Sequence, residues 1–189
     1  RLTDVTGVQT CALPIYRARN EDYFRSHIDR QAPLITLLTC SDSRVQSQAI
    51  LPDPVNRIFS VENIGNQLAT SEGSVDYGIL HLKTPVLLIV GHSDCGAVKA
   101  CCGDYSGETE AVRRELDSLL PFLSPGHGIP FRVTANIRAQ AAAAQSRYAA
   151  QVAAGTLAVV GAYYDFANDL GRGYGKLVIL SVNGETPAP

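Results

Sequence analysis

One histidine and two cysteines stand where they could share a metal ion. His92 and Cys95 are three residues apart in the stretch HSDC, directly after an apolar run at 85–90, and Cys40 follows another apolar run at 33–39. Such runs are typical of buried parallel strands, whose carboxyl ends meet at one edge of a sheet. Two thiolates and one imidazole suit tetrahedral Zn²⁺, and three protein ligands leave a fourth position for water or substrate. A single cysteine, by contrast, is as often a small buried hydrophobic residue.

An acid and a base follow Cys40 within the loop CSDSR. Asp42 and Arg44 stand two and four residues after the cysteine, so both reach the surroundings of a bound metal. An exposed ion pair is the ordinary role of two such residues. Beside a metal, however, a guanidinium can hold a carboxylate in a fixed geometry through two hydrogen bonds. A structural zinc site would need a fourth Cys or His at a suitable spacing, so the pattern favours a catalytic site.

The elements that must position these residues alternate along the chain. Strand patterns lie at residues 33–39, 57–61, 85–90, 157–162 and 176–182. Helical patterns lie at residues 16–26, 70–82, 110–122 and 134–154, and Ser71 is a candidate N-cap of the second. This alternation predicts an α/β fold, with a mostly parallel β-sheet flanked by helices. Such folds bind ligands outside the carboxyl ends of the strands, where the cysteines and histidine fall.

Composition excludes several classes of protein. The chain has 189 residues, of which 46% are hydrophobic and 18% charged, as expected for one globular domain. Its formal net charge of -2 offers no basic surface for nucleic acid. No apolar run reaches the roughly 18 residues of a membrane span. The 5 cysteines are too sparse for a disulfide scaffold, and Cys101 and Cys102 match no ligand spacing.

The first residues stand apart from the rest. Residues 5–15 (VTGVQTCALPI) resemble the translation of a common sequencing adapter. We therefore expect residues 1–15 to be a non-native segment, and residues 16–189 to form a single zinc-dependent catalytic domain with a truncated N-terminal helix. A cytoplasmic location is expected.

The paired motifs CSDSR and HSDCGA closely resemble those of the β-class carbonic anhydrases. The similarity continues through FSVENIGN, VDYGILHLK, VLLIVGHSDCGAVK and LAVVGAYYDF, and covers most of the chain from about Gln31 onward. It implies an enzyme that reversibly hydrates carbon dioxide to bicarbonate and a proton, by attack of zinc-bound hydroxide. The resemblance makes Cys40, His92 and Cys95 the zinc ligands and implies a homodimer or higher homo-oligomer.

The resemblance also implies roles for residues around the metal. Asp42, held off the zinc by Arg44, would accept a hydrogen bond from the zinc-bound water; in some family members this aspartate becomes a fourth ligand in a closed state. The predicted substrate pocket is similar to the plant type. It consists of Gln31 as hydrogen-bond partner, Phe59, Ile64 and Tyr77 as apolar wall, and the Gly96 N–H as bicarbonate donor. Tyr77 and His81, at i and i+4 on a predicted helix, would take part in proton transfer.

One position departs from the family pattern. Glu62 stands before Asn63, where family members usually carry arginine, so any bicarbonate contact or interface bond of that arginine must be absent or rebuilt.

Two other functions remain open: a related zinc hydrolase of carbonyl sulfide or carbon disulfide, and a non-catalytic zinc-stabilised binding module. A thiol redox protein is disfavoured because the chain lacks a C-x-x-C pair.

Overall fold

The computed structural model describes residues 20–124 and 128–187. The chain divides into two compact units, Arg1–Ala32 and Pro33–Pro189. In the first unit, helix α2 (Glu21–Arg25) begins at Asn20, whose side chain accepts a hydrogen bond from the Tyr23 N–H at 3.0 Å. This helix falls within the helix predicted at 16–26. The segment predicted to be non-native, 1–15, lies outside the described residues.

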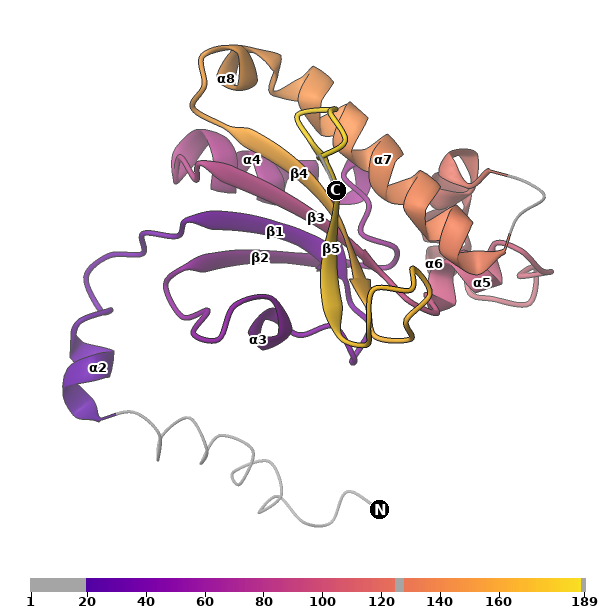
Figure 1. Cartoon of the computed structure of the whole chain (residues 1–189), viewed down its shortest axis with the longest axis horizontal. Helices are drawn as coiled ribbons and strands as arrows, with labels where there is room; N and C mark the ends of the chain where they lie inside the picture. The colour runs from indigo at the N-terminus through magenta and orange to yellow at the C-terminus, as the bar shows by residue number, and fades with distance from the viewer. Residues whose placement is uncertain (1–19, 125–127, 188–189) are drawn as a thin grey trace. The chain divides into compact units, whose positions relative to one another are not determined.

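The second unit is built on a five-stranded sheet (Figure 1). Its strands are β1 (Ile35–Cys40), β2 (Ile58–Asn63), β3 (Val86–His92), β4 (Ala158–Asp165) and β5 (Lys176–Val182). The spatial order is β2-β1-β3-β4-β5; the first four strands are parallel, and β5 pairs antiparallel with β4. The central strands β1 and β3 are buried almost throughout, which explains their continuous apolar runs. The predicted mostly parallel sheet is confirmed.

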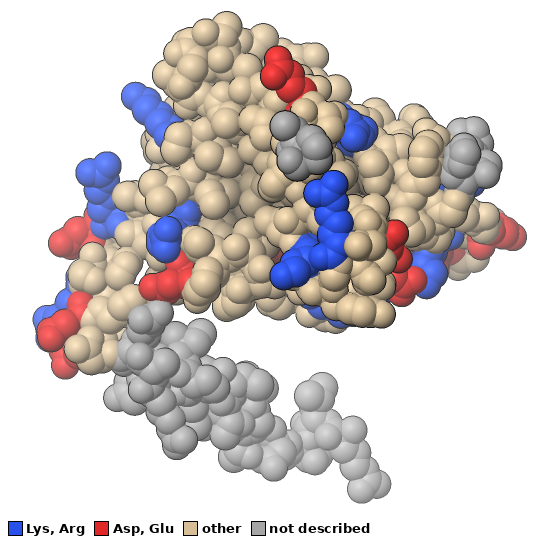
Figure 2. Space-filling model, viewed as in Figure 1, with Lys and Arg blue, Asp and Glu red and all other residues tan. Residues whose placement is uncertain are grey.

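Helices connect and cover these strands. They are α3 (Ser47–Ile50), η1 (Ala69–Ser71), α4 (Glu72–Asp76), η2 (Tyr77–His81), α5 (Gly96–Ala100), α6 (Glu110–Leu119), η3 (Leu120–Phe122), α7 (Ile129–Arg147) and α8 (Ala149–Ala153). The α3 turn was not predicted. Within the described residues, none of these helices has the length and apolarity needed to cross a bilayer. The face shown in Figure 2 carries side chains of both charge signs, in keeping with the net charge of -2.

The helix predicted at 70–82 is a composite of three helical types. A 3₁₀ turn, η1, leads into α4, and a π-helical turn, η2, completes it. The predicted N-cap role of Ser71 is wrong, since its side chain makes no capping hydrogen bond. Its hydroxyl instead accepts a hydrogen bond from Asn63 Nδ2 at 2.8 Å, which ties this helix to the end of β2.

Helix α7 lies across β3 and β4 (Figure 1) and packs its buried side against them. The approach is close at Gly91, where a Cβ atom would lie 2.7 Å from Ile137 Cγ1. The helix begins at Ile129, before the predicted start at 134, because Pro130 fits the first turn of a helix. It ends before the buried Tyr148, so the predicted helix 134–154 is two helices, α7 and α8.

Candidate metal centre

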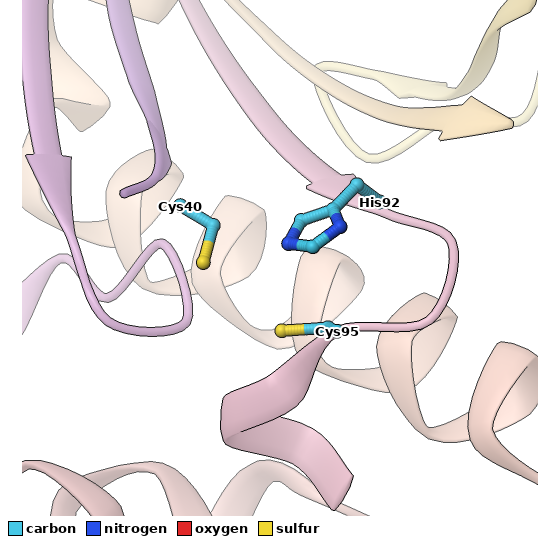
Figure 3. A group of neighbouring side chains, drawn as sticks. All are labelled: Cys40, His92 and Cys95. Carbon is cyan, nitrogen blue, oxygen red and sulfur yellow. The ribbon is translucent and has the colours of Figure 1, made fainter. Parts of the chain in front are cut away.

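Cys40, His92 and Cys95 converge at the carboxyl-terminal edge of the sheet. Cys40 is the last residue of β1 and His92 the last of β3, and these strands are direct neighbours. All three residues are buried, and their Sγ and imidazole nitrogen atoms lie within 4.8 Å of one another. Figure 3 shows the three side chains pointing toward a common centre. The parallel order of β1 and β3 thus brings together two segments that are far apart in the sequence.

A tight turn brings Cys95 back beside His92. Asp94 adopts a left-handed conformation (φ 55°), which reverses the chain after β3. Cys95 then stands at the N-cap of α5, and the N–H groups of Ala97 and Val98 face its sulfur and favour the thiolate. The short helix therefore both positions and electrostatically supports this candidate ligand.

The imidazole of His92 is held in the tautomer that a metal requires. Its Nδ1 donates a hydrogen bond to the carbonyl oxygen of Ser93 at 2.8 Å, which leaves the lone pair on Nε2. Nε2 is buried and has no hydrogen-bond partner among the described residues. A buried acceptor without a donor is unfavourable, and a cation between the three side chains would satisfy it.

The two thiols cannot both ionise without added positive charge. The pKa of Cys40 is lowered, chiefly because the Cys95 thiol donates a hydrogen bond to its sulfur, and the Gly65 N–H at 3.5 Å adds to this effect. The pKa of Cys95 is raised because its proton is held by the Cys40 sulfur and because burial disfavours a second thiolate. A dication would remove this conflict, so two sulfurs and one neutral imidazole fit Zn²⁺.

Asp42 and Arg44 form a bidentate ion pair beside the cluster. Arg44 Nε donates to Asp42 Oδ1 at 2.9 Å and Arg44 Nη2 to Oδ2 at 2.7 Å, while the Arg44 backbone N–H also donates to Oδ1 at 2.9 Å. These bonds lower the pKa of Asp42 to about 2. Asp42 Oδ2 lies 3.9 Å from His92 Nε2. The carboxylate is therefore ionised and adjacent to the candidate metal position, but is turned toward the arginine.

Arg44 has further partners that the sequence did not indicate. Its Nη1 lies 3.3 Å from a carboxylate oxygen of Asp94, and its Nη2 donates to the Asp94 carbonyl oxygen at 3.2 Å. Lys99 Nζ donates to the same Asp94 carboxylate at 2.6 Å. The guanidinium carbon lies 4.7 Å from the ring centroid of Phe166, which follows β4. Phe166 belongs to the stretch YYDF, but nothing in its spacing points to the site.

The sequence of this chain is similar to those of known carbonic anhydrases. The family model described as carbonic anhydrase matches residues 35–172, which is more than half of the chain. A carbonic anhydrase of Mycolicibacterium smegmatis is 28% identical over 167 residues, covering 82% of this chain and 81% of that protein. A carbonic anhydrase of Pseudomonas aeruginosa is 35% identical over 92 residues, covering 45% of this chain and 41% of that protein.

The chain belongs to the β-class carbonic anhydrase family.

Solved β-carbonic anhydrases share its fold. One from Sordaria macrospora superposes with a TM-score of 0.76 at 23% identity, covering 93% of this chain and 95% of that chain. One from Coccomyxa, in complex with acetazolamide, gives a TM-score of 0.75 at 22% identity, covering 96% and 87%. The resemblance inferred from the motifs is thus confirmed, and the α/β fold is that of the β-carbonic anhydrases.

The predicted pocket residues of this β-carbonic anhydrase do not all meet at the metal centre. Ile64 packs in the same cluster as Cys40 and Cys95, and Gly96 opens α5 beside them. Gln31 belongs to the first unit, so its predicted contact with substrate stays a prediction.

The aromatic residues of the predicted pocket form a separate group. Phe59 and Tyr77 have ring centroids 5.8 Å apart, and Tyr77 and His81 lie 4.5 Å apart. Phe59 pairs with Thr36, four residues before Cys40 on β1, which corresponds to roughly 13 Å along a strand. Phe59 also packs against a different core cluster from that of Cys40. Within one chain these three aromatic side chains cannot line the space beside Cys40.

Glu62, the departure from the usual family arginine, lies near the metal edge on β2. Its backbone is opposite Thr39, one position before the pair of Asn63 and Cys40. Its side chain is exposed. β2 is an outer strand of the sheet. Glu62 therefore presents a negative charge on this outer strand, where members of the family usually carry a positive one.

Proposed function

We propose that this protein catalyses the reversible hydration of CO₂ to bicarbonate and a proton, with Zn²⁺ held by Cys40, His92 and Cys95. The observation that supports this most directly is the buried Nε2 of His92, which has no hydrogen-bond partner among the described residues and faces two sulfurs. The adjacent pair of Asp42 and Arg44 has no purpose in a purely structural zinc site. A non-catalytic binding module is therefore disfavoured.

Each residue of the centre would have a distinct role. When bound, zinc would lower the pKa of a water molecule in its fourth position from 15.7 to roughly 7. Asp42 can accept a hydrogen bond from water in the site and orient a lone pair toward the carbon of CO₂. Arg44 keeps the carboxylate of Asp42 away from the metal by occupying both of its oxygens. The N–H of Gly96, the first residue of α5, would donate to a bicarbonate oxygen.

A direct assay tests this proposal. Purified protein lacking residues 1–15 is expected to contain about one zinc per chain and to hydrate CO₂ in stopped-flow measurements. Carbonyl sulfide and carbon disulfide should be offered to the same preparation, because a hydrolase of these substrates would share the metal centre. Zinc-loaded protein that turns over only the sulfur compounds would replace the proposed substrate. Zinc-loaded protein inactive on all three would instead indicate a binding module.

We further propose a homo-oligomer in which a second copy supplies the aromatic wall of the pocket. Phe59 and Tyr77 lie too far from Cys40 to reach the metal centre of their own chain. Tyr77 is nevertheless 43% exposed, so its ring is available to another chain. The Sordaria macrospora relatives are described as tetrameric, which supports such an assembly. His81, whose ring lies beside that of Tyr77 in a tilted arrangement, would then serve proton transfer for the neighbouring site.

Complementation between two inactive variants tests the shared pocket. Cys40→Ser and Tyr77→Ala chains are each expected to be nearly inactive, because one lacks a ligand and the other the aromatic wall. Co-expressed, they would form mixed dimers with one intact site. Activity should then recover to about one quarter of wild type at most.

Co-expression of Cys40→Ser with Asp42→Ala is the control and should recover nothing, since both changes affect the same centre. Equal recovery in both mixtures would contradict the shared pocket.

A further inference from the structure

Phe166 contacts three side chains beside the candidate metal centre. Its ring stacks on the imidazole of His92, with centroids 5.9 Å apart and planes at 28°. The Tyr164 and Phe166 rings form a T-shaped pair, with centroids 5.7 Å apart and planes at 71°. The guanidinium carbon of Arg44 lies 4.7 Å from the centroid of the same ring. One half-buried side chain therefore contacts both a candidate metal ligand and the arginine that holds Asp42.

The backbone around Phe166 is fixed to the turn that carries the ligands. The Ser93 N–H donates to the Tyr164 carbonyl oxygen at 3.1 Å, and the Ser93 hydroxyl accepts from the Ala167 N–H at 3.2 Å. The same hydroxyl donates to the buried carboxylate of Asp165 at 3.0 Å. That carboxylate also accepts the N–H groups of Asp169 at 2.7 Å and Leu170 at 2.8 Å. Phe166 thus has little freedom to move away from His92 and Arg44.

The hydrogen bonds of Asp165 are strong enough to keep it charged. Burial opposes ionisation, but the N–H groups of Leu170 and Asp169 and the Ser93 hydroxyl outweigh it, so the pKa of Asp165 is lowered. An ionised carboxylate holds three donors at once, which makes the loop after β4 a rigid support.

Arg44 needs such a support because its other contacts leave it partly free. Its side chain is 45% exposed, and both of its hydrogen bonds to Asp94 are longer than 3.1 Å. Asp42 binds along the edge of the guanidinium, whereas the Phe166 ring lies against it as a cation–π partner. The hydrogen bonds to Asp42 and the contact with the ring are different interactions, and both restrict the guanidinium. Without the ring, water could take its place beside the guanidinium, which could then tilt away from Asp42.

We propose that Phe166 is a positioning residue that fixes Arg44 and thereby keeps Asp42 off the metal. This inference rests on the proposed function, because it concerns the same carboxylate. Phe166 touches neither substrate nor water in this scheme and acts through Arg44. The loop after β4 therefore helps decide whether the centre is open to water or closed by Asp42.

Three variants at one position test the role of the ring. Phe166→Leu removes the aromatic face, Phe166→Met removes it while keeping the side chain long, and Phe166→Tyr keeps it. In the leucine and methionine variants kcat is expected to fall about 10-fold, with zinc content retained, as for the loss of other groups that orient a metal site. The tyrosine variant should stay near wild type. Tyr174→Leu is the control, because Tyr174 is a 75% exposed aromatic residue further along the same loop.

Two readouts separate positioning from a general loss of packing. In the zinc-loaded protein, the Arg44 Nε–H, assigned by the loss of its resonance in Arg44→Lys, should exchange faster with water in Phe166→Leu than in the wild type or in Phe166→Tyr, because its hydrogen bond to Asp42 is held less firmly. In the cobalt-substituted protein, the visible absorption of Phe166→Leu should move in the same direction as that of Arg44→Ala. In the Arg44→Ala background, Phe166→Leu should lower kcat no further.

The outcomes that overturn this inference differ from those that overturn the proposed function. Wild-type kcat in Phe166→Leu, or an additional loss of kcat in the Arg44→Ala background, would remove Phe166 from this role. If the wild-type protein does not hydrate CO₂, the proposed function fails. The cobalt spectra and the exchange rate of the Arg44 Nε–H would then still decide whether Phe166 controls the position of Asp42, and unchanged spectra and exchange would exclude it.

Discussion

Cys40→Ser is expected to abolish CO₂ hydration and to remove most of the zinc. The substitution exchanges a charged soft ligand for a neutral hard one, and serine remains protonated at neutral pH. The Cys40 sulfur also accepts a hydrogen bond from the buried Cys95 thiol, so Cys95 loses this partner in the variant. Because metal binding contributes to the free energy of folding, the melting temperature should fall as well. Metal analysis, stopped-flow hydration and thermal unfolding measure the three effects.

A cysteine outside the cluster provides the matched control. Cys102→Ser makes the same chemical change at an exposed position and should leave zinc content and turnover unchanged. Treatment of the wild-type protein with a strong chelator should reproduce the loss seen in Cys40→Ser, and added Zn²⁺ should reverse it. Full activity in protein verified to be free of metal would contradict the zinc mechanism altogether.

Arg44→Ala is expected to lower kcat by roughly 10–100-fold while zinc content is largely kept. In the structure both oxygens of Asp42 are held by Arg44, and one of them lies 3.9 Å from His92 Nε2. Without the guanidinium, the carboxylate is free to turn toward the cation and to displace water from it. The loss should therefore appear in turnover and in the cobalt spectrum, with little change in the metal content.

Arg113→Ala controls for the loss of a partly exposed arginine. Arg113 on α6 donates to the Ser106 carbonyl oxygen, so its removal breaks one exposed hydrogen bond without touching Asp42. Its kinetics should match the wild type. The double variant Arg44→Ala with Asp42→Ala should bind zinc with an open fourth position. If Arg44→Ala alone is fully active, another group must orient Asp42.

The sequence alone was sufficient for the strands and for the candidate ligands. The runs before Cys40 and His92 are apolar without alternation, because β1 and β3 are covered on both faces. Parallel strands that end in polar residues place those residues at one edge, so the meeting of Cys40, His92 and Cys95 followed from pattern and chemistry. The pair of Asp42 and Arg44 was predictable for the same reason, since both lie within four residues of Cys40.

Helix boundaries were less predictable. The helix predicted to start at residue 134 begins at Ile129, because a proline in the first turn leaves no hydrogen bond unmade. Ser71 has the side chain of an N-cap, but Asn63 is near enough to use its hydroxyl. At Ser71 the local preference was compatible with two structures, and the tertiary contact with Asn63 decided between them.

Only the tertiary structure decided what surrounds the centre. Phe166 reaches Arg44 and His92 because β4 is the neighbour of β3 and ends at the same edge. Phe59, by contrast, is separated from Cys40 by the register of β2 against β1. A sequence pattern records the periodicity of each strand but not which residues of two strands stand opposite each other. Register and strand order are set by the packing of the whole sheet. The candidate ligands and the pair of Asp42 and Arg44 could therefore be predicted from local motifs, whereas the contacts of Phe166 could not.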